Sequence, residues 1–150
     1  MTLDEIIEGF QSVDIEMRLE LLLDYSKQLP AIGERYQAER DAGLHRVVEC
    51  MSPVFLWMER IERDDGRGGG DGGGRIHIIA DVAEEAPTVK GFLAIIIEAF
   101  DGRLVEEVRS VPLDLVHLLG LSSVIRMNRA QGISAIITRI RRAAEACAVE

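Results

Sequence analysis

The sequence predicts an α+β fold, in which a small antiparallel sheet built on a hairpin packs against several helices. Two segments rich in β-branched and aromatic residues, 54–63 and 75–81, flank a glycine-rich stretch, as the two strands of a hairpin do. Segments with the helical spacing of apolar residues precede and follow this pair. Because strands and helices do not alternate, a hairpin-based sheet with helices packed on it is expected rather than a parallel sheet.

The N-terminal part is typical of two helices. Thr2 is followed three residues later by a carboxylate, which is the spacing of a capping box, and we expect this helix to end near Gln11. Asp14 or Ser12 then caps a second, amphipathic helix. Pro30 ends the second helix, because the residue before a proline avoids the helical conformation.

The central part of the chain contains Cys50. A polar segment with a possible helical turn at 34–40 leads into it. The stretch 44–57 then predicts a short strand, a tight loop that holds Cys50, and a second strand, because Pro53 interrupts regular backbone pairing just after the thiol.

The stretch 64–74 between the two hairpin strands contains seven glycines in eleven residues. A glycine-rich loop can bind phosphate where it leads from a strand into a helix. This loop leads into another strand and carries three aspartates, which would repel an anion. The pattern therefore favours a flexible hairpin tip.

The C-terminal half predicts a core helix and a long last helix. Pro87 suits the first helical position, the segment 89–100 is apolar almost all round, and Gly102 follows where a left-handed C-cap belongs. Asn128 is a plausible cap for the last helix, expected over 129–146. Its inward face is predicted to carry Ile133, Ile136, Ile137 and Ile140. Two short helices or turns are expected between the long ones, at 104–108 and 113–119.

Length and charge narrow the class of protein. The 150 residues fit one domain over 1–150, long enough to bury a sizeable core. The net charge of −9 argues against a nucleic-acid partner, whose phosphates are bound mainly by lysine and arginine. The apolar runs are too short to cross a membrane, and the acidic N-terminus does not resemble a secretory signal. We therefore expect a cytoplasmic protein with no membrane contact.

The cysteines and histidines do not form a metal-binding pattern. Cys50 and Cys147 lie far apart in the sequence, and the three histidines are scattered. Two cysteines are too few for a disulfide scaffold, and no Cys-x-x-Cys or Cys/His spacing is present. We expect no metal and no cofactor.

Cys50 is the leading candidate for chemistry. A thiol is nucleophilic only as the thiolate, which nearby positive charge favours and apolar burial disfavours. An isolated cysteine in an apolar context is also compatible with a small, packed hydrophobic residue. That second interpretation is favoured for Cys147, which lies at the chain terminus.

Four segments in order carry a resemblance to a known family. They are Leu-Pro at 29–30, Glu-Cys-Met-Ser-Pro-Val-Phe-Leu at 49–56, Glu-Glu-Ala-Pro-Thr-Val-Lys-Gly-Phe at 84–92, and Leu-Gly-Leu at 119–121 with Asn-Arg-Ala-Gln-Gly-Ile at 128–133. In this order and spacing the chain resembles the SufE family of cysteine desulfuration proteins, the sulfur acceptors of iron–sulfur cluster assembly. Glu49 and Met51 stand where the family usually has glycine and glutamine. A glutamate close to a desolvated thiol disfavours the thiolate.

The resemblance implies a function as a sulfur carrier. A pyridoxal-phosphate cysteine desulfurase forms a persulfide on its own cysteine, Cys50 takes the outer sulfur, and the sulfur then passes to an iron–sulfur scaffold protein. The carrier itself holds no cofactor and stimulates the desulfurase. Arg129 matches the family arginine near the reactive cysteine, where its guanidinium could favour the thiolate.

Two other functions remain open at this stage. A standalone cysteine hydrolase or transferase needs a histidine base near Cys50. A pure interaction module would regulate a partner by docking, with Cys50 used only for packing.

Overall fold

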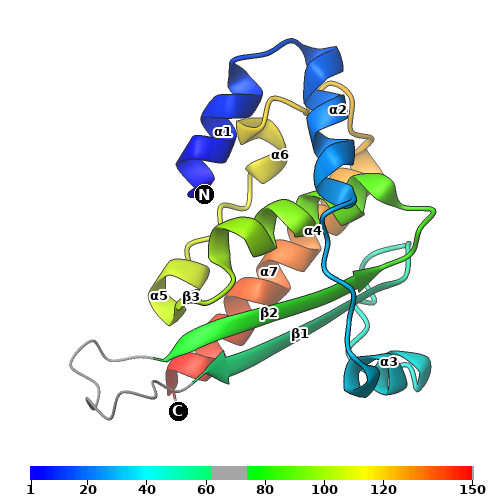
Figure 1. Ribbon diagram of the computed structural model, residues 1–150, viewed down its shortest axis with the longest axis vertical. Coiled ribbons are helices and arrows are strands. Elements are labelled where there is room, and N and C mark those ends of the chain that lie inside the picture. Colours follow the sequence, from blue (N-terminus) through cyan, green and yellow to red (C-terminus); the bar gives the residue numbers. More distant parts are fainter. Residues whose placement is uncertain (62–73, 150) are drawn as a thin grey trace.

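The computed structural model describes residues 1–61 and 74–149. Figure 1 shows a small sheet at one end of the protein, with α4 and α7 next to it and α1, α2 and α6 farther away. The seven helices of the described residues are α1 (Leu3–Gln11), α2 (Ile15–Ser26), α3 (Glu34–Asp41), α4 (Pro87–Phe100), α5 (Val105–Val108), α6 (Leu115–Leu118) and α7 (Met127–Val149).

The sheet is antiparallel and confirms the predicted α+β class. Its strands are β1 (Val54–Ile61), β2 (Arg75–Val82) and β3 (Arg103–Leu104), in the order β1-β2-β3. β1 and β2 pair from Val54 with Val82 to Ile61 with Arg75, so they form the predicted hairpin. β3 was not predicted, because its two residues are too few to show a strand period. Of the predicted glycine-rich tip, residues 64–73 lie outside the described residues.

The prediction of a strand before Cys50 is wrong. Residues 42–45 form turns, and only an isolated bridge joins Arg46 to Phe55. Gly43 and His45 both have positive φ angles, of 78° and 64°. This left-handed backbone turns the chain away from the extended conformation, so the ladder along β1 cannot continue.

The two N-terminal helices form as predicted, except that α2 ends at Ser26, before Pro30. Thr2 and Glu5 make the reciprocal bonds of a capping box, and α1 ends at Gln11. These hydrogen bonds from Thr2 also lower the pKa of the Glu5 carboxyl. Asp14 rather than Ser12 caps α2, accepting a hydrogen bond from the backbone N–H of Met17 at 2.9 Å.

The sheet has two buried faces of different size. The larger core fills the space between one face, α4 and α7, and it also takes in Ile6 and Phe10 of α1 and Leu22 of α2. On the other face, Phe55, Trp57 and Ile79 form a small cluster with Ile32. Ile32 belongs to the segment between α2 and α3, which crosses the sheet in Figure 1.

α4 is the predicted core helix. It begins at Pro87, which takes an N-terminal position, and nine of its fourteen residues are buried. Its closest neighbour is α2, because Gly91 faces the backbone of Leu22: a Cβ added at Gly91 would lie 2.5 Å from the Leu22 carbonyl oxygen. Gly102 follows α4 with a φ of 76°, as predicted.

α7 begins earlier than predicted. The backbone N–H of Ala130 donates to the Arg126 carbonyl at 2.9 Å, so the helix includes Met127 and Asn128. Asn128 is therefore not the cap; it lies in the first turn, and its Oδ1 accepts a hydrogen bond from the Arg129 N–H at 2.9 Å. The four isoleucines expected on the inward face are all buried.

Candidate functional site

Cys50 lies in a turn between the bridge at Arg46 and the start of β1. We call residues 47–53 the Cys50 turn. The Cys50 N–H donates to the Val47 carbonyl at 3.2 Å, and the Val47 N–H donates to the Val54 carbonyl at 2.8 Å. These bonds close the turn on itself and fix it to the first residue of β1.

The Cys50 side chain is buried although its neighbours are exposed. Cys50 is 5% exposed, whereas Val48 is 74% and Met51 82% exposed. The thiol points toward α7: a Cβ added at Gly132 would lie 3.3 Å from the Cys50 Sγ. The absence of a side chain at Gly132 therefore lets the helix backbone approach the sulfur closely.

Two further contacts attach this region to α7. The Asn128 Nδ2 donates to the Met51 Sδ at 3.8 Å, and the Arg139 Nη1 donates to the Arg46 carbonyl at 3.1 Å. Both are made by exposed or half-buried side chains, one at the residue just before the turn and one within it. The turn is thus attached to α7 by two polar contacts, while Val47 and Cys50 pack into the large core.

A cavity of about 210 Å³ brings together the two residues predicted for the site, Cys50 and Arg129. Its other lining residues are Met51, Ser52, Val89 and Asn128. Arg129 is half-buried, and its Nη1 is a buried donor with no hydrogen-bond partner among the described residues. A guanidinium group with a free donor can stabilise an anionic sulfur in the same cavity.

Glu49 does not share this cavity. Its side chain is exposed and lines a separate groove with Ala135, Thr138, Arg139 and Arg142. Water screens an exposed carboxylate strongly, so Glu49 is not placed to oppose a thiolate at Cys50 by a desolvated contact.

None of the three histidines is placed to act as a base for Cys50. None lines the Cys50 cavity, and the structure gives none of them a hydrogen bond to the thiol. His45 is exposed and packs near the Trp57 ring, with the centroids 5.7 Å apart. Within residues 1–61 and 74–149, no three acidic, histidine or cysteine side chains form a possible metal site.

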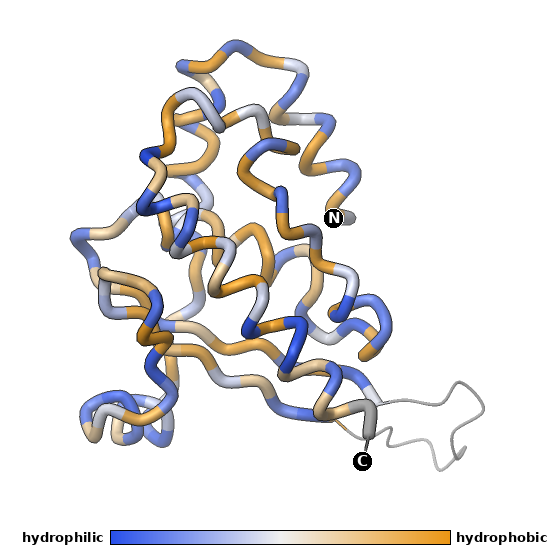
Figure 2. The backbone as a smooth tube through the Cα atoms, turned by 180° about the vertical axis from the view of Figure 1, so that it is seen from behind, coloured by the Kyte–Doolittle hydropathy of each residue, from blue (hydrophilic) through white to orange (hydrophobic). Residues whose placement is uncertain are grey.

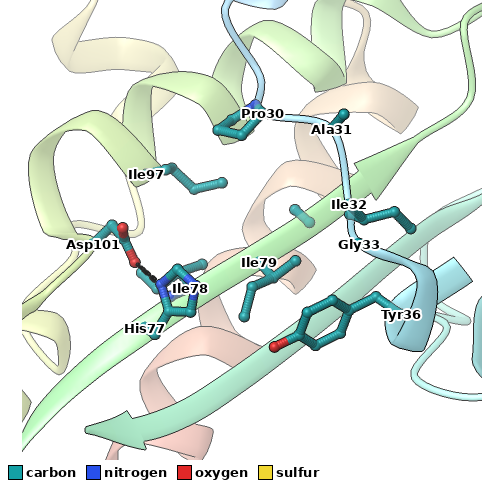
Figure 3. Close-up of a pocket in the computed structure, with 11 residues that line it drawn as sticks. Pro30, Ala31, Ile32, Gly33, Tyr36, His77, Ile78, Ile79, Ile97 and Asp101 are labelled. Atoms are coloured by element: carbon teal, nitrogen blue, oxygen red, sulfur yellow. Dashed lines mark hydrogen bonds and ion pairs between the residues drawn. The ribbon is translucent and has the colours of Figure 1, made fainter.

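His77 takes part in a different cavity, on the face of the sheet that the segment between α2 and α3 crosses. Its Nδ1 lies 2.8 Å from the Asp101 Oδ1, in a space of about 230 Å³ that Figure 3 shows. Asp101 also accepts the Ile78 N–H at 2.7 Å, so it joins the end of α4 to β2. This histidine and aspartate pair lies away from the residues that line the Cys50 cavity.

Cys147 is half-buried near the end of α7 and packs against the large core. Its carbonyl accepts a hydrogen bond from the Arg60 Nη1 at 2.9 Å. The predicted packing interpretation therefore agrees with its position.

Gly132 is the site residue that the sequence analysis did not single out. It lies three residues after Arg129, and residues three apart share one face of a helix. The Arg-x-x-Gly spacing was therefore a sequence signal for Gly132. In the structure, the arginine and the glycine both face the Cys50 turn.

The fold and this site define a small α+β protein that holds one thiol under a turn, beside an arginine with a donor that no described residue satisfies. The chain belongs to the SufE family, described as an Fe-S metabolism associated domain, which it matches over residues 4–144. No helix in the described part of the chain has both the length and the apolar character needed to cross a membrane.

Individual relatives agree with this family. The chain is 29% identical over 140 residues to an uncharacterized SufE-like protein of Mycobacterium tuberculosis, covering 93% of this chain and 89% of that protein. It is 28% identical over 116 residues to the sulfur acceptor protein CsdE of Escherichia coli, covering 77% and 68%. The solution structure of a hypothetical protein from Thermus thermophilus has a TM-score of 0.76, with 26% identity and full coverage of both chains.

Proposed function

We propose that this protein is a sulfur acceptor that takes persulfide sulfur from a cysteine desulfurase onto Cys50 and passes it on for iron–sulfur cluster assembly. The observation that carries the proposal is the shared cavity of Cys50 and Arg129 in a member of the SufE family. The name of the relative CsdE, a sulfur acceptor protein, supports the same function.

The transfer is a thiol–disulfide exchange. The Cys50 thiolate attacks the outer sulfur of the desulfurase persulfide, a new S–S bond forms at Cys50, and the S–S bond of the donor breaks. The donor cysteine leaves as a thiolate, and the product is the Cys50 persulfide. The sulfur atom moves without an external oxidant or reductant, because one S–S bond replaces another.

Arg129 stabilises the two anions of this step on the Cys50 side. Before the attack it faces the thiolate, and afterwards it faces the terminal sulfur of the persulfide, which is also anionic at neutral pH. The unsatisfied Nη1 is available for this hydrogen bond because no described residue accepts from it.

The Cys50 turn must open for the transfer. A sulfur in a side chain that is only 5% exposed cannot reach a partner's persulfide while it is packed against α7. Opening requires loss of the contact at Gly132 and of the two weak bonds to α7. When closed, the same turn shields a persulfide from reductants in solution.

Sulfide release by a partner enzyme tests the proposal. A cysteine desulfurase, supplied with cysteine and a reductant, should release sulfide faster when the purified chain is added. Cys50→Ser should remove the stimulation, and Cys147→Ser should leave it unchanged because that residue packs against the core. Equal stimulation by wild type and Cys50→Ser rules out the carrier function.

The burial of the thiol also favours a second candidate, an interaction module that docks on a partner without accepting sulfur. In that case Cys50 is only a packing residue, as its 5% exposure would suggest on its own. The two candidates differ in whether Cys50 becomes covalently modified.

A further inference from the structure

Two arginines of α7 line a groove beside the Cys50 turn. The groove has a volume of about 360 Å³ and is lined by Glu49, Ala135, Thr138, Arg139 and Arg142. The four α7 residues recur at spacings of three and four, so they share one face of the helix. Glu49 directly precedes Cys50, which places the groove next to the thiol. We call it the arginine groove.

Among the described residues, the positive charge of the arginine groove is only partly balanced. Arg142 is exposed, and Arg139 donates one hydrogen bond to a backbone carbonyl. Neither arginine forms an ion pair with any residue that the structure describes. The lining contains one carboxylate, from Glu49, against two guanidinium groups.

The segments that form the groove are rich in arginine although the protein is acidic. Residues 44–52 and 124–147 contain six arginines and two glutamates, whereas the whole chain has a net charge of −9. Figure 2 shows hydrophilic and hydrophobic residues alternating along α7, the helix that carries four of these arginines. Charge separated in this way steers an oppositely charged partner toward one face.

Exposed apolar side chains flank the same region. Val48 and Met51 of the Cys50 turn are 74% and 82% exposed, and Met127 at the start of α7 is 73% exposed. Methionine and arginine are enriched in protein interfaces, where apolar residues form the centre and charged residues the rim. The face around Cys50 therefore has the composition of a docking surface.

We propose that the arginine groove binds an acidic segment of the sulfur-donating protein, with a carboxylate of that segment between Arg139 and Arg142. The inference rests on the proposed function and extends it, because it states that the partner surface is acidic. The apolar side chains of the Cys50 turn contact the partner next to this carboxylate. Docking there also competes for the Arg139 guanidinium, whose bond to the Arg46 carbonyl helps to hold the region closed.

Charge reversal at Arg142 tests the inference. The measured quantity is the concentration of the chain that gives half-maximal stimulation of a cysteine desulfurase, at low and at high salt. Arg142→Glu should raise this concentration about tenfold at low salt and leave the maximal rate unchanged, because a docking contact is lost and the chemistry is not. The difference should shrink at high salt, which screens exposed charges.

Arg109→Glu is the matched control. Arg109 is exposed at the end of α5 and forms no ion pair with a described residue, and its replacement changes the net charge by the same amount. The control should behave as wild type. Alkylation of Cys50 should proceed at the wild-type rate in both variants, which shows that the turn is intact.

The outcomes separate the inference from the function on which it rests. In one outcome, wild type accepts sulfur while Arg142→Glu and Arg109→Glu stimulate the desulfurase with the same concentration dependence. In that case the proposal of an acidic docking segment is wrong, and the carrier function stands. If wild type neither stimulates the desulfurase nor accepts sulfur, both are wrong. A selective, salt-dependent effect of Arg142→Glu supports both.

Discussion

Gly132 determines how closely α7 approaches the Cys50 sulfur. A Cβ there would lie 3.3 Å from Sγ, which is tighter than an ordinary van der Waals contact. Cys50 was a candidate from the sequence itself and Arg129 was implied by the family resemblance, and the structure places both in one cavity. Gly132 lies in a segment that carries the resemblance, three residues after Arg129. The sequence did not show that its backbone faces the thiol, because a glycine within a helix looks the same whether it faces water or another chain segment.

Gly132→Ala should make Cys50 more reactive toward iodoacetamide. The added methyl group pushes the sulfur away from the helix and loosens the turn, so we expect the alkylation rate to rise several-fold. The melting temperature should change little, because alanine favours the helix by about 1 kcal/mol and the tight contact offsets this gain.

Gly9→Ala is the control for Gly132→Ala. Gly9 is exposed in α1, and an added Cβ there has no heavy atom within 4 Å. It should raise the melting temperature and leave alkylation of Cys50 unchanged. If Gly132→Ala alkylates no faster than Gly9→Ala, Gly132 does not control access to the thiol.

Arg129→Met should slow the alkylation of Cys50 at neutral pH about three- to tenfold, because methionine fills similar space without a charge to favour the thiolate. Arg129→Lys should restore part of the rate. The rates are measured under native conditions and compared with the same variants unfolded in urea, where all should be equal. Identical native rates for both variants and wild type contradict the role given to Arg129.

At the scale of elements, α4 and α2 hold the helical layer together. The Gly91 backbone lies against Leu22, and side chains on both sides of this contact are fully buried. Backbone atoms cannot rotate away as a flexible side chain does, so this contact tolerates no added atom.

Gly91→Ala should lower the free energy of unfolding by about 1–3 kcal/mol, because its Cβ would overlap the Leu22 carbonyl oxygen at 2.5 Å. Urea denaturation measures the change. Gly9→Ala, the same substitution in an open helix position, should change stability in the opposite direction. A stabilised Gly91→Ala variant means that α2 and α4 are not packed as closely as described.

The long elements and the short helices α3, α5 and α6 were predictable from the sequence, whereas the two-residue strand β3 and the bridge at Arg46 were not. The helices α1, α2, α4 and α7 and the strands β1 and β2 have clear periods, caps or prolines, so their presence follows from local chemistry. β3 depends on pairing with β2, which is distant in the sequence, and the bridge joins single residues, Arg46 and Phe55, so neither shows a strand period. The start of α7 was misplaced because Asn128 bonds to a neighbouring N–H within the helix as readily as it caps one.

For the whole molecule, one large core joins the parts. It includes side chains of α1, α2, β1, β2 and α4 through α7. Among the described residues, the only other cluster of buried apolar side chains is the small one around Trp57, on the far face of the sheet. No segment therefore has a separate core large enough to keep it folded without the rest of the chain.

Thermal unfolding should occur in one cooperative transition. Calorimetry and circular dichroism should give the same midpoint, because removing any one helix exposes the shared core. Two separable transitions would show that the chain contains more than the one domain predicted over residues 1–150.

Intact-mass spectrometry shows whether Cys50 receives a sulfur atom. The chain is incubated with a cysteine desulfurase and cysteine, without reductant, and compared with Cys50→Ser and Cys147→Ser. We expect the mass of wild type and of Cys147→Ser to increase by one sulfur atom, and the mass of Cys50→Ser to stay the same. An unchanged wild-type mass, or an equal increase in Cys50→Ser, would contradict the proposed function.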